Sequence, residues 1–292
     1  MTRTRAVSRG FLLAACCLPL SADPALAHGP LHEQIEALST RIERDPLDAR
    51  LYLRRGELYG HHGETEAALA DFDRAKRLDP ALIAVDLSRG KLLFLAGRLA
   101  EARVALDGFL AAQPDDPDAL STLARTHAGL GRPGEAVEDY TRAIRAREKR
   151  GQALPDDYLE RARVEAGRGG EHALEALRGL DEGLARLGPL VSLELYAIEL
   201  ELAAGRRDAA LARLAAPAAQ SPRKEPWLLR RAEILERAGR AADARLAYEQ
   251  AAGAIDALPS RHRRTRATLE LESRVREGLA RLQAGTAREA SP

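Results

Sequence analysis

The side chains best suited to chemistry in this sequence are histidines, and four of them lie near its N-terminal end. His28 and His32 are one helical turn apart, and His61 and His62 are adjacent. Imidazole nitrogens are common metal ligands, so these four could together hold zinc. Adjacent residues point in different directions on a helix, however, and a solvent-facing helix end explains the same pattern. We expect no metal site, and calorimetric titration with zinc tests that expectation.

Motifs for other chemistry are missing from the sequence. It contains no glycine-rich phosphate loop with its lysine and no G-x-S-x-G nucleophile elbow. Its 2 cysteines, Cys16 and Cys17, both fall within residues 1–27. The chain beyond residue 27 therefore lacks a thiolate nucleophile, a thiolate metal ligand and a disulfide. We expect a protein that is not an enzyme and that uses no cofactor.

Composition narrows the class of protein further. Hydrophobic residues make up 45% of the 292 residues and aromatic residues 4%, which is typical of an Ala/Leu-rich helical protein. The formal net charge is only +1, which argues against a nucleic-acid partner. The densest basic run, residues 261–266, has no interleaved aromatic side chains for base stacking. This run and the basic run at residues 145–150 are both interpreted as solvated faces, with an anion or membrane contact as the alternative for the first.

The N-terminus has the features of an export signal. Three arginines precede an apolar stretch at residues 11–20, which is too short to span a bilayer. Ala25-Leu26-Ala27 then fits a cleavage site. We expect residues 1–27 to be a signal peptide, cut after Ala27, that delivers a periplasmic or secreted protein. The alternative is acylation at Cys16, since Leu13-Ala14-Ala15-Cys16 resembles a lipobox; only then would the protein be held at a membrane.

A repeat of 34 residues organises the rest of the chain. Small, turn and bulky residues recur in a fixed order: Gly56, Gly90 and Ala124; Gly63, Gly97 and Gly131; Ala68, Ala102 and Ala136; Phe72, Leu106 and Tyr140. The order returns at Gly205 and Gly239, and at Ala210 and Ala244. The small residues let two helices approach closely, the later glycine ends the first helix, and the bulky residue fills the space between them.

An arginine also recurs just before the first small residue of the repeat, at Arg55, Arg89, Arg161 and Arg231. A regular position in every repeat favours a structural role. We expect these side chains to pack along their stems and to direct their guanidinium groups to water or to a carboxylate.

Residues 52–80 resemble the tetratricopeptide repeat family, and the resemblance extends over about residues 49–258. It implies an all-α, right-handed superhelix (an α-solenoid) of about six helix pairs with capping helices. The expected organisation is a signal peptide at 1–27, an N-terminal cap at 28–48, repeats 1–3 at 49–150, repeats 4–6 at 151–258, a C-terminal cap at 259–283 and a disordered tail at 284–292. Repeat 4 is degenerate, and the expected bend lies at 147–156.

The same resemblance implies a concave surface, lined by the first helix of each pair, that binds an extended peptide or a partner helix. The matching positions are Arg50, Leu53, Glu57, Leu87, Lys91, Phe94, Ser121, Arg125, Leu159, Arg163, Leu195 and Glu199. Some family members hold a C-terminal carboxylate with Lys and Asn at the places where Leu53 and Glu57 stand, so that clamp is not expected here. Phe94 either anchors a peptide or packs within its own repeat.

The predicted function is a non-enzymatic scaffold or adaptor in the bacterial periplasm that binds a partner polypeptide. The alternative is a lipid-anchored component of an envelope assembly machine, attached through Cys16.

Overall fold

The computed structural model describes residues 29–289, with side chains up to residue 284, and these residues form helices without any strand. The proposed signal peptide and Cys16 lie outside the described residues. The chain divides into two compact units, unit 1 ending at Leu82 and unit 2 beginning at Ile83. None of the helices between residues 29 and 289 is both long enough and apolar enough to cross a membrane.

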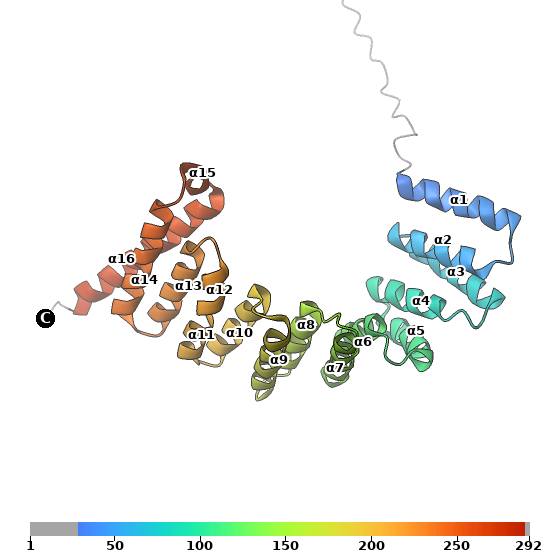
Figure 1. The fold of residues 1–292 in the computed structure, drawn as a ribbon, viewed down its shortest axis with the longest axis horizontal. Helices are drawn as coiled ribbons and strands as arrows, with labels where there is room; N and C mark the ends of the chain where they lie inside the picture. Colours follow the sequence, from blue (N-terminus) through green and yellow to red (C-terminus); the bar gives the residue numbers. More distant parts are fainter. Residues whose placement is uncertain (1–28, 290–292) are drawn as a thin grey trace, which may run out of the picture. The chain divides into compact units, whose positions relative to one another are not determined.

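The described part of unit 1, residues 29–82, contains three helices, which Figure 1 shows in blue to blue-green. They are α1 (Pro30–Arg44), α2 (Ala49–His61) and α3 (Thr65–Leu78). The α2–α3 pair is the first repeat, and α1 packs on α2 as the predicted N-terminal cap. Ile35, Leu38 and Ile42 on one face of α1 are buried, as a helix-period apolar stripe requires.

Unit 2 contains five further helix pairs and the C-terminal helices (Figure 1). The pairs are α4 (Ala84–Leu95) with α5 (Leu99–Ala112), α6 (Pro117–Gly129) with α7 (Pro133–Lys149), α8 (Pro155–Gly167) with α9 (His172–Leu187), α10 (Val191–Ala203) with α11 (Arg207–Arg213), and α13 (Glu225–Arg237) with α14 (Ala241–Asp256). Three helices stand outside the pairs: α12 (Ala215–Gln220), α15 (Ser260–Arg263) and α16 (Arg266–Glu289). The predicted all-α array of six helix pairs is confirmed.

The repeat register predicted from small and bulky residues places both kinds in the core. The second helices bury Ala68 with Phe72, Ala102 with Leu106, Ala136 with Tyr140, and Ala244 with Tyr248, each at 2% exposure or less. A Cβ atom on Gly56 would lie 2.7 Å from Phe72 Cε1, and one on Gly90 would lie 2.6 Å from Leu106 Cγ. Glycine at these two positions therefore permits the close approach of the paired helices.

Local sequence also accounts for where the helices end. Gly97 and Gly239, each with φ near +74° (74° and 73°), follow the first helices of their pairs in the left-handed region that glycine adopts without strain. Pro117, Pro133 and Pro155 open α6, α7 and α8, where a missing N–H costs no hydrogen bond.

Two segments differ from the other repeats. Helix α7 has 17 residues and is followed by a connection that contains Gly151 at φ 66°, in the segment of the expected bend. Helix α16 continues to Glu289, past the expected end of the C-terminal cap at residue 283. Leu269, one of the apolar residues of this cap, is exposed, whereas Val275 is buried against α14.

The second helix of the fifth pair is interrupted. Helix α11 has only 7 residues, against 14 to 17 in the other second helices, and the 6-residue α12 follows it after Leu214. Pro217 has no N–H to bond the Arg213 carbonyl four residues earlier, and its ring crowds that carbonyl. Pro217 therefore breaks the helix here.

Candidate functional site

Four first helices of unit 2, α4, α6, α8 and α10, form a continuous layer of adjacent elements. Helix α4 contacts α6, and α8 contacts α10, while a side-chain hydrogen bond joins α6 to α8. We call the side chains that these four helices present at Phe94, Arg125, Arg163 and Tyr196 the first-helix surface. Its geometry follows from the repeat, because equivalent faces of successive first helices lie next to each other.

An arginine stacks on an aromatic ring at the first contact in this layer. The Arg125 guanidinium carbon, on α6, lies 5.2 Å from the centre of the Phe94 ring on α4, within cation–π range. Arg125 is exposed and donates to the Ser121 carbonyl, and no carboxylate among residues 31–284 pairs with it. Phe94 is only half-buried, so its ring neither enters the core nor lies free. Lys91 stands one turn before Phe94 and is also half-buried.

A second arginine–aromatic stack joins α8 to α10. The Arg163 guanidinium carbon lies 5.8 Å from the centre of the Tyr196 ring, and its Nη1 donates to Glu160 at 2.6 Å. Leu195 and Glu199 on α10 are exposed beside this stack. Tyr196 was not among the sequence-predicted residues, although an aromatic residue next to a predicted contact position was a readable signal.

The remaining predicted residues of unit 2 serve the core more than the surface. Leu87 and Leu159 are half-buried and pack against the apolar clusters beneath them. Ser121 is buried at 6% exposure, and its hydroxyl donates to Asp157 at 2.8 Å. The Ser121 hydroxyl is therefore committed to an internal contact and is not presented to a partner.

Ser121 belongs to an ionic cluster, the Arg147 network, that holds α6, α7 and α8 together; Ser121, Arg147 and Asp157 are buried, and Asp118 is exposed. Arg147 Nε donates to Asp157 at 2.8 Å and Nη2 donates to Asp118 at 2.6 Å. The hydrogen bond from Arg147 is the main cause that lowers the pKa of Asp118. Arg147 lies in a basic run that sequence reasoning interpreted as a solvated face, whereas this arginine is buried.

In unit 1 the predicted residues lie along α2. Arg50 is exposed near the start of the helix, where its backbone N–H donates to the Asp48 side chain. Leu53 and Glu57 are half-buried, and Glu57 accepts from Arg54 at 3.2 Å. Helix α2 thus presents a mixed surface of its own.

Two of the recurring arginines confirm the predicted structural role. Arg55 donates to both carboxylate oxygens of Asp71 at 2.8 Å and to the Ser39 hydroxyl at 2.9 Å, which ties α2 to α3 and α1. Arg161 donates to Glu182 at 2.6 Å and so ties α8 to α9. Arg231 differs: it is exposed on α13, and none of the residues that the structure describes forms an ion pair with it.

Three side chains between residues 29 and 284 come together as metal-capable donors, and only His172 among them is a histidine. Glu165, His172 and Glu175 hold their ligand atoms within 4.8 Å of one another. Glu165 also accepts from Arg168 at 2.9 and 3.0 Å, and hydrogen bonds with Glu175 and Glu165 raise the pKa of His172, so these donor atoms already have partners within the protein. Of the histidines considered from sequence, His32 pairs with Glu36 and His62 with Glu64, and His28 lies outside the described residues.

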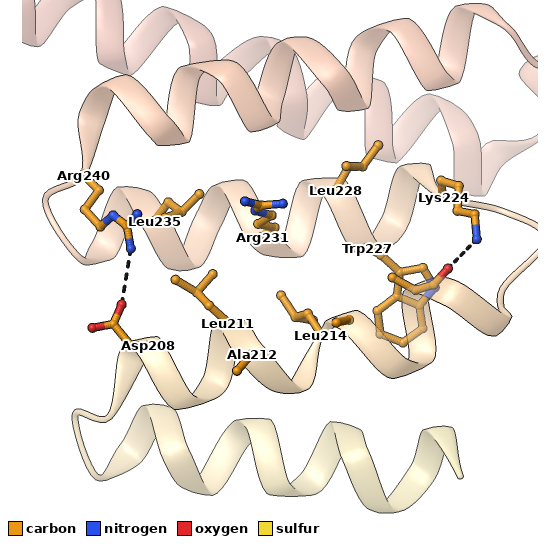
Figure 2. A pocket seen from close by; sticks show the side chains of 12 residues that line it. Asp208, Leu211, Ala212, Leu214, Lys224, Trp227, Leu228, Arg231, Leu235 and Arg240 are labelled. Carbon is orange, nitrogen blue, oxygen red and sulfur yellow. Dashed lines mark hydrogen bonds and ion pairs between the residues drawn. The ribbon is translucent and has the colours of Figure 1, made fainter. Parts of the chain in front are cut away.

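A pocket of about 520 Å³ opens between α11, α12 and α13. Figure 2 shows Leu211 and Leu214 on the α11–α12 side of the pocket, Leu228 and Leu235 along α13, and Trp227 at one end. Arg231 lies in the middle of the α13 side, and Arg240 pairs with Asp208 at the other end (Figure 2). Sequence reasoning did not find this pocket.

Comparison with known families identifies repeats in two parts of the chain. Sequence models described as tetratricopeptide repeat match residues 25–83 and residues 93–154. The first range contains the α2–α3 pair, and the second runs from the end of α4 to the start of α8.

Curated relatives cover part of the chain. It is 31% identical over 127 residues to DnaJ homolog subfamily C member 3 of Rattus norvegicus, covering 41% of this chain and 25% of the relative. A fungal tetratricopeptide repeat and J domain-containing co-chaperone, from Cryptococcus neoformans, is 30% identical over 130 residues, covering 44% and 23% respectively. The match thus spans about a quarter of the length of these relatives.

Solved structures support the fold. A tetratricopeptide repeat protein from Parabacteroides merdae has a TM-score of 0.53 at 18% identity and covers 86% of this chain and 94% of its own. PilW, described as a type IV pilus biogenesis factor, has a TM-score of 0.54 at 20% identity, with coverage of 68% and 89%. PilF of Pseudomonas aeruginosa has a TM-score of 0.52 at 19% identity, with coverage of 68% and 88%.

Proposed function

We propose that this chain, which belongs to the tetratricopeptide repeat family, is a non-enzymatic scaffold that binds a partner polypeptide on the first-helix surface of unit 2. The observation that carries the proposal is the pair of arginine–aromatic stacks, Arg125 on Phe94 and Arg163 on Tyr196. Each half-exposed aromatic ring can bury further against a partner, while Arg125, which has no carboxylate among the described side chains, pairs with an acidic group of that partner.

Rigid support makes this surface suited to binding. The Arg147 network locks α6 to α8, and the clusters under Leu87 and Leu159 hold α4 and α8 on their second helices. A partner would therefore order few protein side chains on binding, which lowers the entropic cost of association. Lys91, Leu195 and Glu199 are proposed to extend the same contact surface. Arg50, Leu53 and Glu57 are proposed to contribute a separate contact on unit 1.

Site-specific photo-crosslinking tests the proposal. A benzoylphenylalanine in place of Phe94 is expected to form adducts with a partner in cells of the source bacterium. The same group in place of Asp107, an exposed residue on second helix α5, is the matched control. Arg125→Glu should remove the Phe94-dependent adducts and leave helicity by circular dichroism unchanged, because Arg125 is exposed. Equal adduct patterns from positions 94 and 107 would contradict a site on the first helices.

The location is proposed from the N-terminal sequence. Cleavage after Ala27 would release the protein into the bacterial periplasm or the medium. The alternative, acylation at Cys16, would make it a lipid-anchored part of an envelope assembly machine. Mass spectrometry of the protein from the envelope fraction separates the two: a mature N-terminus at His28 supports cleavage after Ala27, and a lipid-modified peptide beginning at Cys16 supports the alternative.

A further inference from the structure

The pocket beside Trp227 has the size and lining of a binding site. Its volume of about 520 Å³ falls within the range of sites that enclose small organic groups. Most of its wall is apolar and is contributed by Leu211, Leu214, Trp227, Leu228 and Leu235. The Trp227 and Leu211 side chains are half-exposed, so the pocket can be entered from solvent.

The break at Pro217 accounts for the pocket. In the earlier pairs of unit 2, a full second helix packs along the first helix of the next pair, as α5 does on α6 and α7 does on α8. Here α11 stops at Arg213, and α12 takes over with Ala215 and Ala218, whose side chains are too small to fill the space. The apolar face of α13 that carries Trp227 and Leu228 is therefore left partly uncovered.

Arg231 supplies an uncompensated charge at this pocket. It occupies the repeat position of Arg55, whose guanidinium is bound by Asp71 on the second helix of its pair. The residue of α14 in the register of Asp71 is Ala247, since Ala68 and Phe72 correspond to Ala244 and Tyr248. Arg231 thus has the position of a structural arginine without its carboxylate, and it lines the pocket instead.

The other two cations that line the pocket, Arg240 and Lys224, already have hydrogen-bond or ion-pair partners within the protein. Arg240 pairs with Asp208 at 3.2 Å and with Asp243 at 2.8 Å. The Lys224 ammonium donates to the carbonyls of Ala218 and Ala219 and so caps the C-terminal end of α12. Arg231 is therefore the cation of the lining whose donors have no partner among the described side chains, and a ligand with an acidic group next to an apolar one is complementary to it.

We propose that this pocket binds a polypeptide segment in which a bulky apolar side chain stands next to an acidic residue. The apolar side chain lies against Trp227 and the leucines, and the carboxylate pairs with Arg231. The choice of a polypeptide over another acidic amphiphile rests on the proposed scaffold function. The site itself is separate from the first-helix surface, since it lies between a second helix and the first helix of the next pair.

Intrinsic tryptophan fluorescence tests the proposal directly, because Trp227 lines the pocket and is the only tryptophan in the sequence. The probes are the peptide acetyl-Gly-Glu-Phe-Glu-Gly-amide, the matched peptide with Lys in place of Glu, and laurate as an acidic amphiphile that is not a polypeptide. The acidic peptide is expected to shift the tryptophan emission to shorter wavelength in a saturable way. Arg231→Glu should weaken its binding about tenfold or more and should make the lysine peptide the tighter ligand. Arg237→Glu, the same charge change on an exposed residue of α13 outside the pocket lining, should leave the binding unchanged.

Three results would overturn the proposal. The first is no saturable emission change with either peptide up to about 1 mM. The second is equal affinity of the acidic peptide for the native protein and the Arg231→Glu variant. The third is saturation by laurate alone, which would assign the pocket to a lipid. Loss of peptide binding here with Phe94-dependent crosslinks intact would leave the proposed scaffold function standing, whereas the reverse result would refute the first-helix surface and keep this pocket.

Discussion

Replacing Gly278 with alanine is expected to destabilise the C-terminal part of unit 2. Gly278 on α16 faces the fully buried ring of Tyr248, and a Cβ atom there would lie 2.3 Å from Cζ and 2.5 Å from Cε1. Ordinary carbon contacts are about 3.5 to 4 Å, so the ring or the helix must move by about 1 Å. The Tyr248 hydroxyl cannot follow freely, because it donates to Glu236 at 2.6 Å and Arg281 holds that carboxylate.

The magnitude follows from opposing effects. Overpacking a close contact costs about 1–3 kcal/mol, and weakening the tyrosine hydrogen bond costs about 1 kcal/mol more. Alanine in place of glycine within a helix recovers about 1 kcal/mol. We therefore expect Gly278→Ala to lower the free energy of unfolding by about 2 kcal/mol.

Urea unfolding followed by Trp227 emission measures this effect, since α13 contacts both α14 and α16. The control is Gly253→Ala on α14, where an added Cβ would have no heavy atom within 4 Å. That variant should gain about 0.4–1 kcal/mol, because only the helix preference and the reduced freedom of the unfolded chain act. If both variants were equally stabilised, α16 could not lie on Tyr248 as described.

Three further predictions concern the core and the buried charges. Ala68→Leu or Ala102→Leu should cost about 1–3 kcal/mol of stability by forcing paired helices apart, and thermal melting that stayed at the native temperature would refute the repeat register. Arg147→Met should lower the free energy of unfolding by about 3–5 kcal/mol, because it leaves the Asp157 carboxylate buried with only the Ser121 hydroxyl. Arg147→Lys should not restore this stability, because one ammonium cannot reproduce the geometry of two guanidinium hydrogen bonds. Urea unfolding that showed full recovery in the lysine variant would disprove this account. Burial raises the pKa of Glu194 and outweighs the opposing effect of Arg213, whose Nη1 lies 3.6 Å from Glu194 Oε2, so the ionised form opposes folding. Glu194→Gln should therefore raise the melting temperature at pH 7. The gain should vanish as the pH falls below the ordinary glutamate pKa of 4.5, where the Glu194 carboxyl is protonated in both the folded and the unfolded protein. A gain that was independent of pH would count against this account.

The repeat could be predicted because its determinants are local and recurrent. Gly56 meets Phe72, and Gly90 meets Leu106, within a single pair, so the spacing of these residues carries the register. The terminal cap α1 was predictable for the same reason, from its apolar stripe. The residues that recur with the repeat pack between paired helices, so their spacing in the sequence predicts this packing.

The candidate site was less predictable because it depends on departures from the repeat. Ser121 occupies a position predicted to contact a partner, but its hydroxyl bonds Asp157, which lies 36 residues away in the degenerate fourth repeat. Arg231 matches the periodic arginine, yet its freedom follows from Ala247 on another helix. Pro217 is readable as a helix breaker, whereas the pocket that it opens depends on the small side chains that happen to follow it.

The Arg147 network limits how this array could be rearranged. Asp118, Ser121, Arg147 and Asp157 come from two successive pairs, so neither pair carries a complete set. A recombinant protein that duplicates, deletes or transplants the third pair alone would strand a buried carboxylate or guanidinium at the new joint. Modular engineering of this chain should therefore move helices α6–α9 as one block, and natural shuffling of its repeats would face the same restriction.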